Sequence, residues 1–371
     1  MKIVMFGHKR IPSREGGVEI VVEELSTRMA ALGHSVTCYN RGGHHVSGKQ
    51  YDVQTGGSFH GVRLRTVPTL DKKGLAAVTS SFFAGIRSAF SGAEVVHIHA
   101  EGPAFMCWLP KLFGKRVIVT VHGLDWQREK WKSGFGAKYI RMGEKMAVRF
   151  ADEIIVLSEN VRSYFRTAYG RETRWIPNGV CVPERREADV ITEVYGLEKD
   201  EYILFLGRLV PEKGIHYLIE AFRSLDTDKK LVIAGGTSDT DAYVRLLKEA
   251  AGEDARILFT GFVQGGMLEE LYSNAYLYVL PSDVEGMPLS LLEAMSYGNC
   301  CVVSDIPECA EVVEEKAVQF AAGSVDSLRS ALENLCSDST RVSGFRKEAC
   351  RFICEKYSWD DVVCKTMEIY R

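Results

Sequence analysis

The chain has 371 residues, of which 46% are hydrophobic, and this length is too great for one ordinary core and indicates two domains. No run of about 18 apolar residues occurs, which disfavours a membrane-spanning helix. Residues 1–180 hold 26 Lys and Arg against 15 Asp and Glu, whereas residues 181–371 hold 20 against 34. The opposite charges support separate domains, and the basic half favours an anionic acceptor or an anionic membrane surface. Nucleic acid is not an expected partner, because no recognised binding module is present.

Short β-rich runs alternate with helical patterns along the whole chain, which predicts parallel sheets wrapped by helices. Residues 1–7 indicate a first buried strand and not a secretion signal. Expected strands in the first half are 2–6, 36–40, 62–68, 94–99, 116–122, 153–157 and 174–176. Expected helices are 18–32, 75–90, 104–112, 138–150 and 159–168. A linker is expected near residues 176–187, followed by strands 202–206, 231–234, 257–260, 277–280 and 301–304, each with a helical pattern after it.

The fold class that follows is α/β, with two doubly wound domains facing across a cleft. The last helical stripe begins after Ser358, which suits a helix N-cap. Segment 138–150 is read either as a helix packed on its own domain or as a basic amphipathic helix on anionic lipid. Ten cysteines occur without a C-x-x-C pair or a zinc-type spacing, which indicates reduced thiols in a cytoplasmic protein.

The strongest functional signal is Glu285-Gly-Met-Pro-Leu-Ser-Leu-Leu-Glu293, with two glutamates around an expected helix start. Pro288 suits a first helical turn, where its missing N–H costs nothing, and Gly286 allows the backbone close to a ligand. The unpaired N–H groups of that turn favour an anion. The pattern fits a sugar, a diphosphate and a ribose, although a surface helix with a glutamate near each end has the same spacing.

A second signal is Phe205-Leu-Gly-Arg-Leu-Val-Pro-Glu-Lys-Gly214, an expected strand followed by a short loop. Its Arg208 and Lys213 would leave the carboxyl end of the strand together. Ligands bind at that edge of open parallel sheets, and a guanidinium with an ammonium suits a pyrophosphate. The alternative is a pair of solvated loop charges.

These two stretches, together with Thr260-Gly-Phe-Val263 and the closing Tyr357-Ser-Trp-Asp360, resemble the retaining glycosyltransferases of family four, which have the GT-B fold. The resemblance covers essentially the whole chain. It implies an acceptor-binding domain at 1–180 plus about 355–371, and a nucleotide-sugar-binding domain at 181–354. The stretches 9–19 and 123–131 are also similar to bacterial polysaccharide enzymes, including some rhamnosyltransferases.

The resemblance also implies a role for each matching residue. Arg208 and Lys213 would neutralise the donor diphosphate, Glu293 would bind the ribose hydroxyls, and Glu285 would meet hydroxyls of the donor sugar. The backbone of four residues would approach the sugar and phosphates, namely Gly286, Met287, Pro288 and Leu289. The strand end from Gly261 to Val263 would border the base.

In the first half, Gly16 and Gly17 match the family's glycine-rich first loop and would let the backbone approach the diphosphate. The alternative is a plain turn that needs positive φ, and a nicotinamide site is disfavoured because G-x-G-x-x-G is absent. His122 matches a family histidine that faces the donor sugar, and we assign it a catalytic role.

Two carboxylates of the first half, Glu15 and Asp125, are candidates for acceptor hydroxyls. The variable loops 42–57 and 125–136 are expected to build the rest of the acceptor pocket. His97 and His99 close the preceding strand, and we expect one to face the cleft and the other the opposite face.

For the chemistry we expect metal-independent transfer with retention of configuration and no cofactor besides the nucleotide-sugar co-substrate, because Arg208 and Lys213 make a divalent ion unnecessary. Hydrolysis by the two glutamates is disfavoured, since on one helix they would lie about 12 Å apart. A nucleotide-sugar epimerase of the same fold and a non-catalytic nucleotide-sugar-binding protein remain alternatives. The expected donor is a UDP-sugar, with GDP- and dTDP-sugars behind it, and the expected acceptor is a saccharide or lipid-linked saccharide. Together these predict a cytoplasmic protein, either free or peripheral at the inner membrane face.

Overall fold

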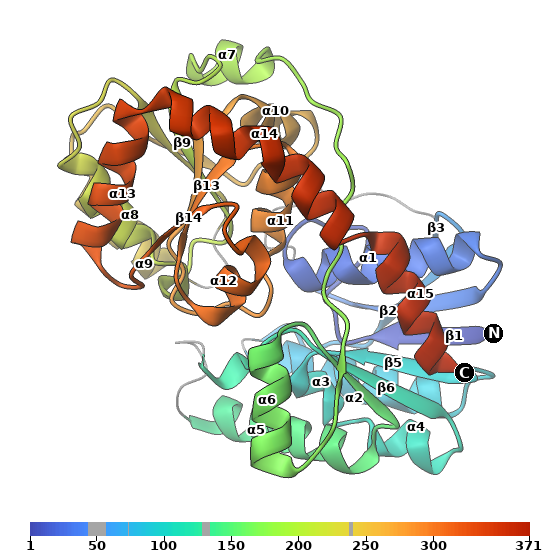
Figure 1. Ribbon diagram of the computed structural model, residues 1–371. Coiled ribbons are helices and arrows are strands. Elements are labelled where there is room, and N and C mark those ends of the chain that lie inside the picture. The colour runs from blue at the N-terminus through green and yellow to red at the C-terminus, as the bar shows by residue number, and fades with distance from the viewer. Residues whose placement is uncertain (44–56, 73, 128–133, 237–239) are drawn as a thin grey trace. The chain divides into compact units, whose positions relative to one another are not determined.

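The computed structural model describes residues 1–43, 57–72, 74–127, 134–236 and 240–371. The chain divides into two compact units, which we call unit 1 (Met1–Asn178 with Trp359–Arg371) and unit 2 (Gly179–Ser358). Both units are α/β, and the C-terminal helix belongs to unit 1 although it follows unit 2 in sequence (Figure 1). Each unit is described by itself.

Unit 1 is built on an eight-stranded sheet in the order β3-β4-β2-β1-β5-β6-β7-β8. All neighbours pair in parallel except β3, which runs antiparallel to β4. Its strands are β1 (Lys2–Phe6), β2 (Ser35–Arg41), β3 (Ser58–Phe59), β4 (Val62–Val67), β5 (Val95–His99), β6 (Arg116–Val121), β7 (Glu153–Val156) and β8 (Arg174–Trp175).

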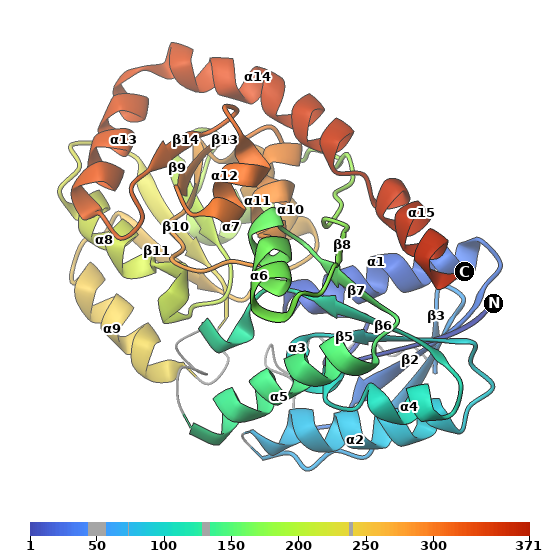
Figure 2. The same ribbon diagram turned by 60° about the horizontal axis from the view of Figure 1, so that its bottom comes forward.

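The helices of unit 1 form two layers around this sheet. Helices α1 and α15 pack together on one face, and α2 to α5 cover the other (Figures 1 and 2). They are α1 (Gly17–Ala31), α2 (Leu75–Ala89), α3 (Glu101–Ala104), α4 (Trp108–Leu112), the 3-10 turn η2 (Asp125–Gln127), α5 (Gly134–Phe150), α6 (Glu159–Tyr169) and α15 (Trp359–Tyr370). Side chains of the sheet such as Phe6, Val96, Ile98 and Val119 form the core between these layers.

Unit 2 has a six-stranded, fully parallel sheet in the order β11-β10-β9-β12-β13-β14. Its strands are β9 (Tyr202–Leu206), β10 (Lys230–Ala234), β11 (Ile257–Gly261), β12 (Leu277–Leu280), β13 (Cys300–Ser304) and β14 (Val318–Phe320). Its helices are α7 (Val190–Tyr195), the turn η4 (Pro211–Lys213), α8 (Ile215–Arg223), α9 (Asp241–Ala251), α10 (Gly266–Asn274), α11 (Leu289–Ser296), α12 (Pro307–Val313), α13 (Val325–Ser337) and α14 (Ser339–Lys356). The expectation of two doubly wound parallel domains is confirmed.

One expected helix was wrong, and two short strands were not anticipated. The helix expected at 104–112 is split into α3 and α4, because Pro110 lacks the N–H that would bond back to the carbonyl of Met106. Leu109 N–H instead donates to that carbonyl at 3.2 Å. The short strands β3 and β14 were not anticipated, since two or three residues carry too little alternation to be recognised.

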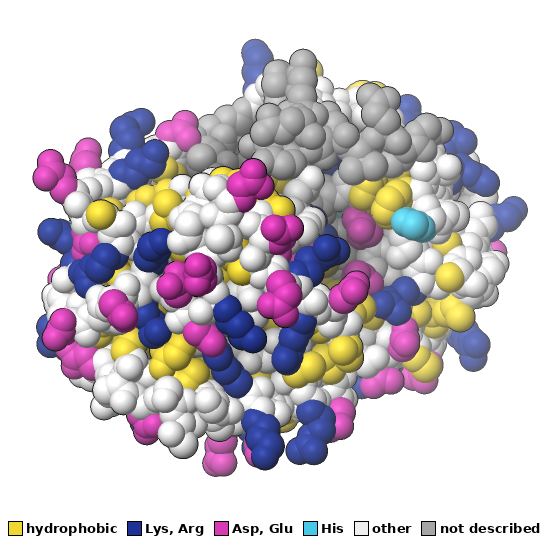
Figure 3. Space-filling view, turned by 90° about the horizontal axis from the view of Figure 1, so that it is seen from above, with side chains coloured by type: hydrophobic (Ala, Val, Ile, Leu, Met, Phe, Trp, Pro, Cys, Tyr) yellow, Lys and Arg dark blue, Asp and Glu magenta, His cyan; other side chains and the backbone are white. Residues whose placement is uncertain are grey.

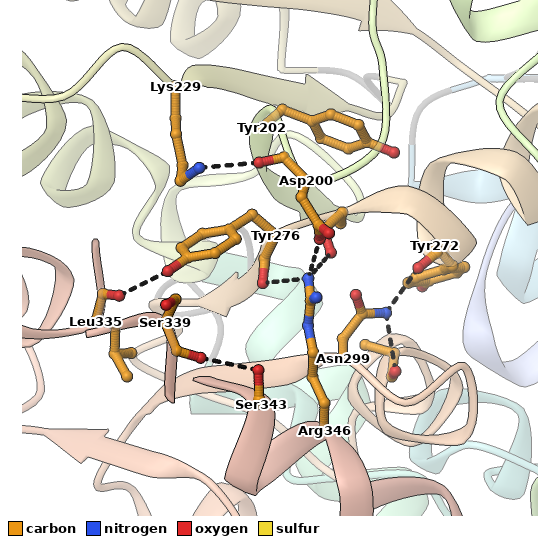
Figure 4. Close-up of polar contacts among 12 residues, drawn as sticks. Asp200, Tyr202, Lys229, Tyr272, Tyr276, Asn299, Leu335, Ser339, Ser343 and Arg346 are labelled. Atoms are coloured by element: carbon orange, nitrogen blue, oxygen red, sulfur yellow. Dashed lines mark hydrogen bonds and ion pairs between the residues drawn. The ribbon is translucent and has the colours of Figure 1, made fainter. Parts of the chain in front are cut away.

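Helix α14 is fixed to the amino edge of the unit 2 sheet by Arg346 (Figure 4). The guanidinium donates to Asp200 Oδ1 at 2.6 Å and to the carbonyl oxygens of Ala275 and Tyr276 at 2.6 and 2.9 Å. Lys229 Nζ lies 3.8 Å from the centroid of the Tyr276 ring. Asp200, Lys229 and Tyr276 come just before β9, β10 and β12. The cluster therefore lies at the amino ends of the strands, whereas Arg208 lies after the carboxyl end of β9.

Candidate active site

Both sheets have a point where the order of the strands reverses. In unit 2 it lies between β9 and β12, and in unit 1 between β1 and β5. Open α/β sheets bind ligands outside the carboxyl ends of the strands at such a point. The loops to inspect are therefore those that follow these four strands.

In unit 2 the loops after β9 and β12 meet through charged side chains. Lys213 Nζ donates to Glu285 Oε1 at 2.5 Å, and Ser282 Oγ donates to the same oxygen at 2.6 Å. The Lys213 and Glu285 side chains are only 13% and 9% exposed. Two residues that the sequence analysis assigned to different parts of the ligand thus form a largely buried ion pair.

Gly214 makes this meeting possible. Its φ is +64°, and a Cβ there would lie 1.9 Å from the carbonyl oxygen of Pro281. Any side chain would therefore push the loop after β9 away from the loop after β12. A backbone bond from Asp283 N–H to the Glu212 carbonyl, 2.9 Å long, ties the same two loops together.

The ion pair determines the electrostatics of this edge. An ammonium has three donors, so Lys213 is able to keep its bond to Glu285 while it donates to an anion. The carboxylate offsets the lysine charge. Because both groups are largely removed from water, removing either one would leave the other charge uncompensated. Arg208 follows β9 as a half-buried side chain at this edge, where it adds a second positive charge.

The second glutamate is held by a tyrosine. Tyr272 Oη donates to Glu293 Oε2 at 3.3 Å. Burial, with a smaller contribution from the Glu293 charge, raises the pKa of Tyr272 well above its ordinary value, so the hydroxyl stays protonated and remains a donor. The Tyr272 ring also stacks on Tyr297, with centroids 5.2 Å apart. The Tyr272 side chain, itself held by stacking, therefore orients the Glu293 carboxylate.

The helix between the glutamates begins later than expected. Pro288 is the residue before α11, with φ −77° and ψ 101°, and does not lie in the first turn. Its carbonyl accepts from the N–H groups of Leu291 and Leu292 at 3.1 and 3.3 Å. Glu285 lies in the preceding loop, so the two glutamates do not share one helix and the 12 Å argument against hydrolysis does not apply.

The backbone segments expected at the ligand have the following places. Gly286, Met287, Pro288 and Leu289 are buried residues between the Glu285 carboxylate and the start of α11. Gly261 ends β11 with φ +73°, and its carbonyl accepts from Gly235 N–H at 2.8 Å. Val263, two residues further on, is buried.

In unit 1, Gly16 and Gly17 lie at the start of α1. Gly16 is extended, with φ −170°, so positive φ does not explain it. A Cβ there would lie 2.7 Å from Glu19 Oε2. The glycine leaves room for the Glu19 carboxylate, which accepts from Lys9 N–H at 2.8 Å. The buried Glu15 lies close by, with Oε2 3.9 Å from Lys9 Nζ.

His122 follows β6, and its ring is stacked on His99 at the end of β5. His99 Nδ1 and His122 Nε2 are 3.1 Å apart, and the ring centroids are 5.3 Å apart. Gly7, with φ +112°, lets the loop after β1 pass the His99 carbonyl, which a Cβ would approach to 2.1 Å. The loops after β1 and β5, which flank the reversal point, and the loop after the next strand, β6, therefore converge on this histidine pair.

The expected opposite orientation of His97 and His99 was wrong. Their ring centroids are 4.2 Å apart, because residues two apart on a strand share a face. His97 bonds Tyr370 Oη of α15 at 2.6 Å and Thr120 Oγ1 at 2.7 Å. His97 thus fixes the C-terminal helix to unit 1.

Asp125 is placed by a buried carboxyl group. Its N–H donates to Glu101 Oε2 at 2.8 Å. Burial, together with the charge of Asp125 and a hydrogen bond to Glu144, raises the pKa of Glu101 well above its ordinary value. Glu144 in turn accepts from the hydroxyl groups of Tyr164 and Tyr169.

Several of these contacts were missed by the sequence analysis. Ser282, Tyr272, Glu101 and Glu144 carry no motif, and their roles become visible only when distant elements meet. Parts of the loops 42–57 and 125–136, to which the acceptor pocket was assigned, lie outside the described residues. The stretch 9–19 is described in full, whereas 123–131 is described only to residue 127.

Two doubly wound sheets, each with a candidate ligand site at its reversal point, are the architecture of GT-B glycosyltransferases. Solved structures with this fold match the whole chain. Sucrose-phosphate synthase from Thermosynechococcus elongatus has a TM-score of 0.81 and 21% identity, with 100% of this chain and 98% of that one covered. Anabaena HepE in complex with UDP and glucose has a TM-score of 0.80 and 17% identity, with 100% and 99% covered.

Sequence comparison goes beyond the fold. The model of glycosyl transferases group 1 matches residues 188–353, and that of glycosyltransferase family 4 matches residues 15–182. An uncharacterized glycosyltransferase of Methanocaldococcus jannaschii is 35% identical over 100% of this chain and 98% of its own length. The chain belongs to these group 1, family 4 glycosyltransferases, and it is a glycosyltransferase enzyme.

Proposed function

We propose that the protein transfers a sugar, with retention of configuration, from a nucleotide-diphosphate sugar to a saccharide or lipid-linked saccharide in cell-surface polysaccharide synthesis. The observation that carries the proposal is the meeting of Lys213, Glu285 and Ser282 at the reversal point of unit 2. A UDP-sugar is the first choice of donor, and the solved neighbour HepE, which holds UDP and glucose, supports it.

The donor would be held by unit 2 and the acceptor by unit 1, the latter through Glu15 and Asp125. Arg208 and Lys213 would bind the diphosphate, and Glu293, oriented by Tyr272, would accept hydrogen bonds from the ribose. Glu285 would orient the donor sugar, and the backbone from Gly286 to Leu289 would approach it. Gly261 and Val263 would border the base.

In the transfer step the bond from the anomeric carbon to the diphosphate oxygen breaks with its electron pair leaving on the diphosphate. The acceptor oxygen forms its bond on the same face, and its proton passes to the departing diphosphate oxygen. Fixed cations aimed at the leaving group lower such a barrier by several kcal/mol. Arg208 and Lys213 supply this charge, His122 is proposed to contact the donor sugar, and Gly16 and Gly17 would admit the diphosphate near α1.

Metal independence is part of the proposal and rests on these two cations. Paired aspartates of the Asp-x-Asp type are able to bind a divalent ion, and the sequence contains two such stretches, at 226–228 and 239–241. The first precedes β10 and lies at the amino edge of the sheet, away from the end that Arg208 follows. Asp239 of the second lies outside the described residues. Chelation with EDTA therefore tests this part of the proposal separately.

The deciding experiment measures nucleotide release from UDP-, GDP-, dTDP- and ADP-sugars, with and without EDTA, followed by product analysis. A Glu285→Ala variant is the control. Selective, EDTA-insensitive release that the substitution abolishes is the expected result. A changed sugar without any acceptor product would instead establish an epimerase, and tight donor binding with no product from any acceptor would establish a binding protein.

Glu285→Ala also separates binding from turnover. The substitution removes the carboxylate that offsets the Lys213 charge, so affinity for the bare nucleotide diphosphate should stay equal or rise while turnover falls by at least about a hundredfold. Isothermal titration with the nucleotide and a turnover assay on the same preparation measure the two. Loss of nucleotide binding together with turnover would remove Glu285 from the proposed sugar-orienting role.

A further inference from the structure

Helix α2 of unit 1 buries its small side chains and exposes its large apolar ones, which is the reverse of an ordinary surface helix. Its buried residues are small or hydroxylic, namely Ser80, Ser81, Ala84, Gly85, Ser88 and Ala89. Its large apolar residues point outward: Leu75, Phe82, Phe83 and the C-terminal Phe90 are 43%, 48%, 37% and 69% exposed. Their spacing places them along one helical stripe. A surface helix of a protein that remains in water normally buries such a stripe.

The close packing of α2 explains why its inner face is small. A Cβ on Gly85 would lie 3.1 Å from atoms of Met106, so a larger side chain there would lift the helix from the layer below. The hydroxyl groups of Ser81 and Ser88 are satisfied by carbonyl oxygens one turn earlier, both at 2.6 Å. The inner face of α2 is therefore closely packed with its hydroxyl groups hydrogen-bonded, and the outward apolar side chains do not contribute to the core.

The stripe continues onto α4. The Phe90 and Phe113 rings meet edge to face with centroids 4.5 Å apart, and Leu112 beside them is 69% exposed. Helices α2 and α4 lie side by side in the same layer (Figure 2). Phe82 and Phe83 also meet edge to face, with centroids 5.5 Å apart, so exposed aromatic and aliphatic side chains extend along α2 and onto the end of α4. Scattered single apolar side chains are normal, whereas a contiguous group of this kind marks an interaction site.

Helix α5, which contacts α4 in the same layer, presents positive charge on its outer face. Its residues Tyr139, Ile140 and Ala147 are buried, which confirms that it packs on its own unit. Its exposed face carries Lys138, Arg141, Met142, Lys145 and Arg149, and its acidic residue, Glu144, is buried. An apolar stripe on α2 and α4 thus lies beside a basic stripe on α5.

We propose that this surface, formed by the outward residues of α2, α4 and α5, docks on an anionic lipid bilayer. Phenylalanine and leucine side chains enter the boundary between headgroups and acyl chains, and the lysines and arginines of α5 meet the anionic headgroups. The charge also decides against a second copy of the chain, because a two-fold contact through this face would bring basic stripes near each other. No described helix is long and apolar enough to cross a membrane.

A lipid-linked acceptor would require the protein to bind at a membrane, and this surface would make that contact. In this respect the inference rests on the proposed function. Its test does not, since vesicle binding needs neither donor nor acceptor. A failure of the transferase proposal would leave vesicle binding intact, and a failure of vesicle binding would leave nucleotide binding intact.

The experiment is flotation of the full chain with vesicles of phosphatidylcholine alone and of phosphatidylcholine with phosphatidylglycerol. The wild type should float with the anionic vesicles only, and less as salt rises. A Phe82→Ser/Phe83→Ser/Phe90→Ser variant should lose at least about tenfold in affinity. A Lys138→Glu/Lys145→Glu variant should lose a similar factor, and its binding should depend less on salt than that of the wild type.

The matched control is on α9 of unit 2, where Leu246 is exposed between the exposed Arg245 and Lys248. Leu246→Ser and Arg245→Glu/Lys248→Glu should bind vesicles like the wild type. Thermal melting and nucleotide titration of every variant show that it is folded. Three results would overturn the proposal: no flotation of the wild type, equal flotation of the α2 variant, or a dimer in light scattering that the α2 substitutions dissociate while lipid is ignored.

Discussion

At the scale of single residues, the buried pair of Lys213 and Glu285 is the feature most open to test. Removing one partner of a buried ion pair leaves an uncompensated charge, so Lys213→Met should lower the free energy of unfolding by about 3 kcal/mol. Adding Glu285→Gln should recover about half of the loss. Urea unfolding of the singles and the double variant measures this, and additive losses would show that the two charges do not depend on each other.

The second residue-scale prediction concerns which nitrogen of His122 carries the proton. Within the described part of the chain, the buried Nε2 of His99 has no hydrogen-bond partner. A buried N–H without an acceptor costs more than an acceptor without a donor, so the His99 proton belongs on Nδ1 and is donated to His122 Nε2. His122 then carries its own proton on Nδ1.

Long-range 1H–15N spectra of histidine-labelled protein distinguish the two tautomers. The wild type and His99→Asn, whose amide is able to replace the Nδ1–H donor, should show His122 protonated on Nδ1. His99→Leu should show a mixture and a lower turnover number at unchanged KM. A wild-type His122 protonated on Nε2 would reverse the assigned direction of the bond.

At the scale of elements, the approach of the loops after β9 and β12 depends on Gly214. Gly214→Ala should destabilise the protein by about 3 kcal/mol and abolish donor binding, because its Cβ would meet the Pro281 carbonyl. Gly170, at the end of α6, has nearly the same backbone angles and open space around its Cβ position. Gly170→Ala should therefore cost only the conformational strain, about 1 kcal/mol, in a parallel urea unfolding series. Equal costs for both would show that the loops adapt.

Helix α14 is predicted to depend on Arg346 in a comparable way. Arg346→Ala leaves the carbonyl groups of Ala275 and Tyr276 without this donor, and we expect a loss of about 2 to 4 kcal/mol. The exposed pair of Arg329 with Asp326 is the comparison, and Arg329→Ala should cost less than about 0.5 kcal/mol. Hydrogen exchange should show faster exchange over α14 in the first variant alone.

At the scale of the whole molecule, the two units should differ in acid. Burial lowers the pKa of His8 to about 4 and that of His97 to about 3, and it also lowers the pKa of His99. All three belong to unit 1. A lowered folded-state pKa means that the unfolded state binds protons first, so the stability from neutral histidine is full above about pH 6.5 and is lost as the pH falls toward 4 and 3.

Unit 1 should therefore open first between about pH 6.5 and 4, at up to about 4 kcal/mol per pH unit if all three histidines take part. Hydrogen exchange followed by mass spectrometry resolves the two units. His97→Gln should make the dependence shallower by roughly one proton. Earlier opening of unit 2 would show that other groups govern the acid response.

Charge is distributed on the same large scale, and here the sequence is only a partial guide. The halves have opposite net charges, yet acidic and basic side chains are interspersed on the face drawn in Figure 3. The basic surface that the structure does define is the outer face of α5, within the segment 138–150 that the sequence analysis had singled out. The apolar stripe beside it on α2 was not recognised, because helical periodicity shows that a stripe exists but not which way it faces.

Local patterns in the sequence predicted the alternation of strands and helices, the two parallel-sheet domains and the family of the chain, because hydrophobic period and motif spacing are local properties. They also selected Arg208, Lys213, Glu285, Glu293 and His122 as residues of interest. Three contacts became visible in the folded chain alone: Lys213 and Glu285 form one largely buried pair, Tyr272 orients Glu293, and His99 supports His122. Those contacts join residues far apart in the chain, and they exist because strand order brings loop ends together at the reversal point, which no local pattern records.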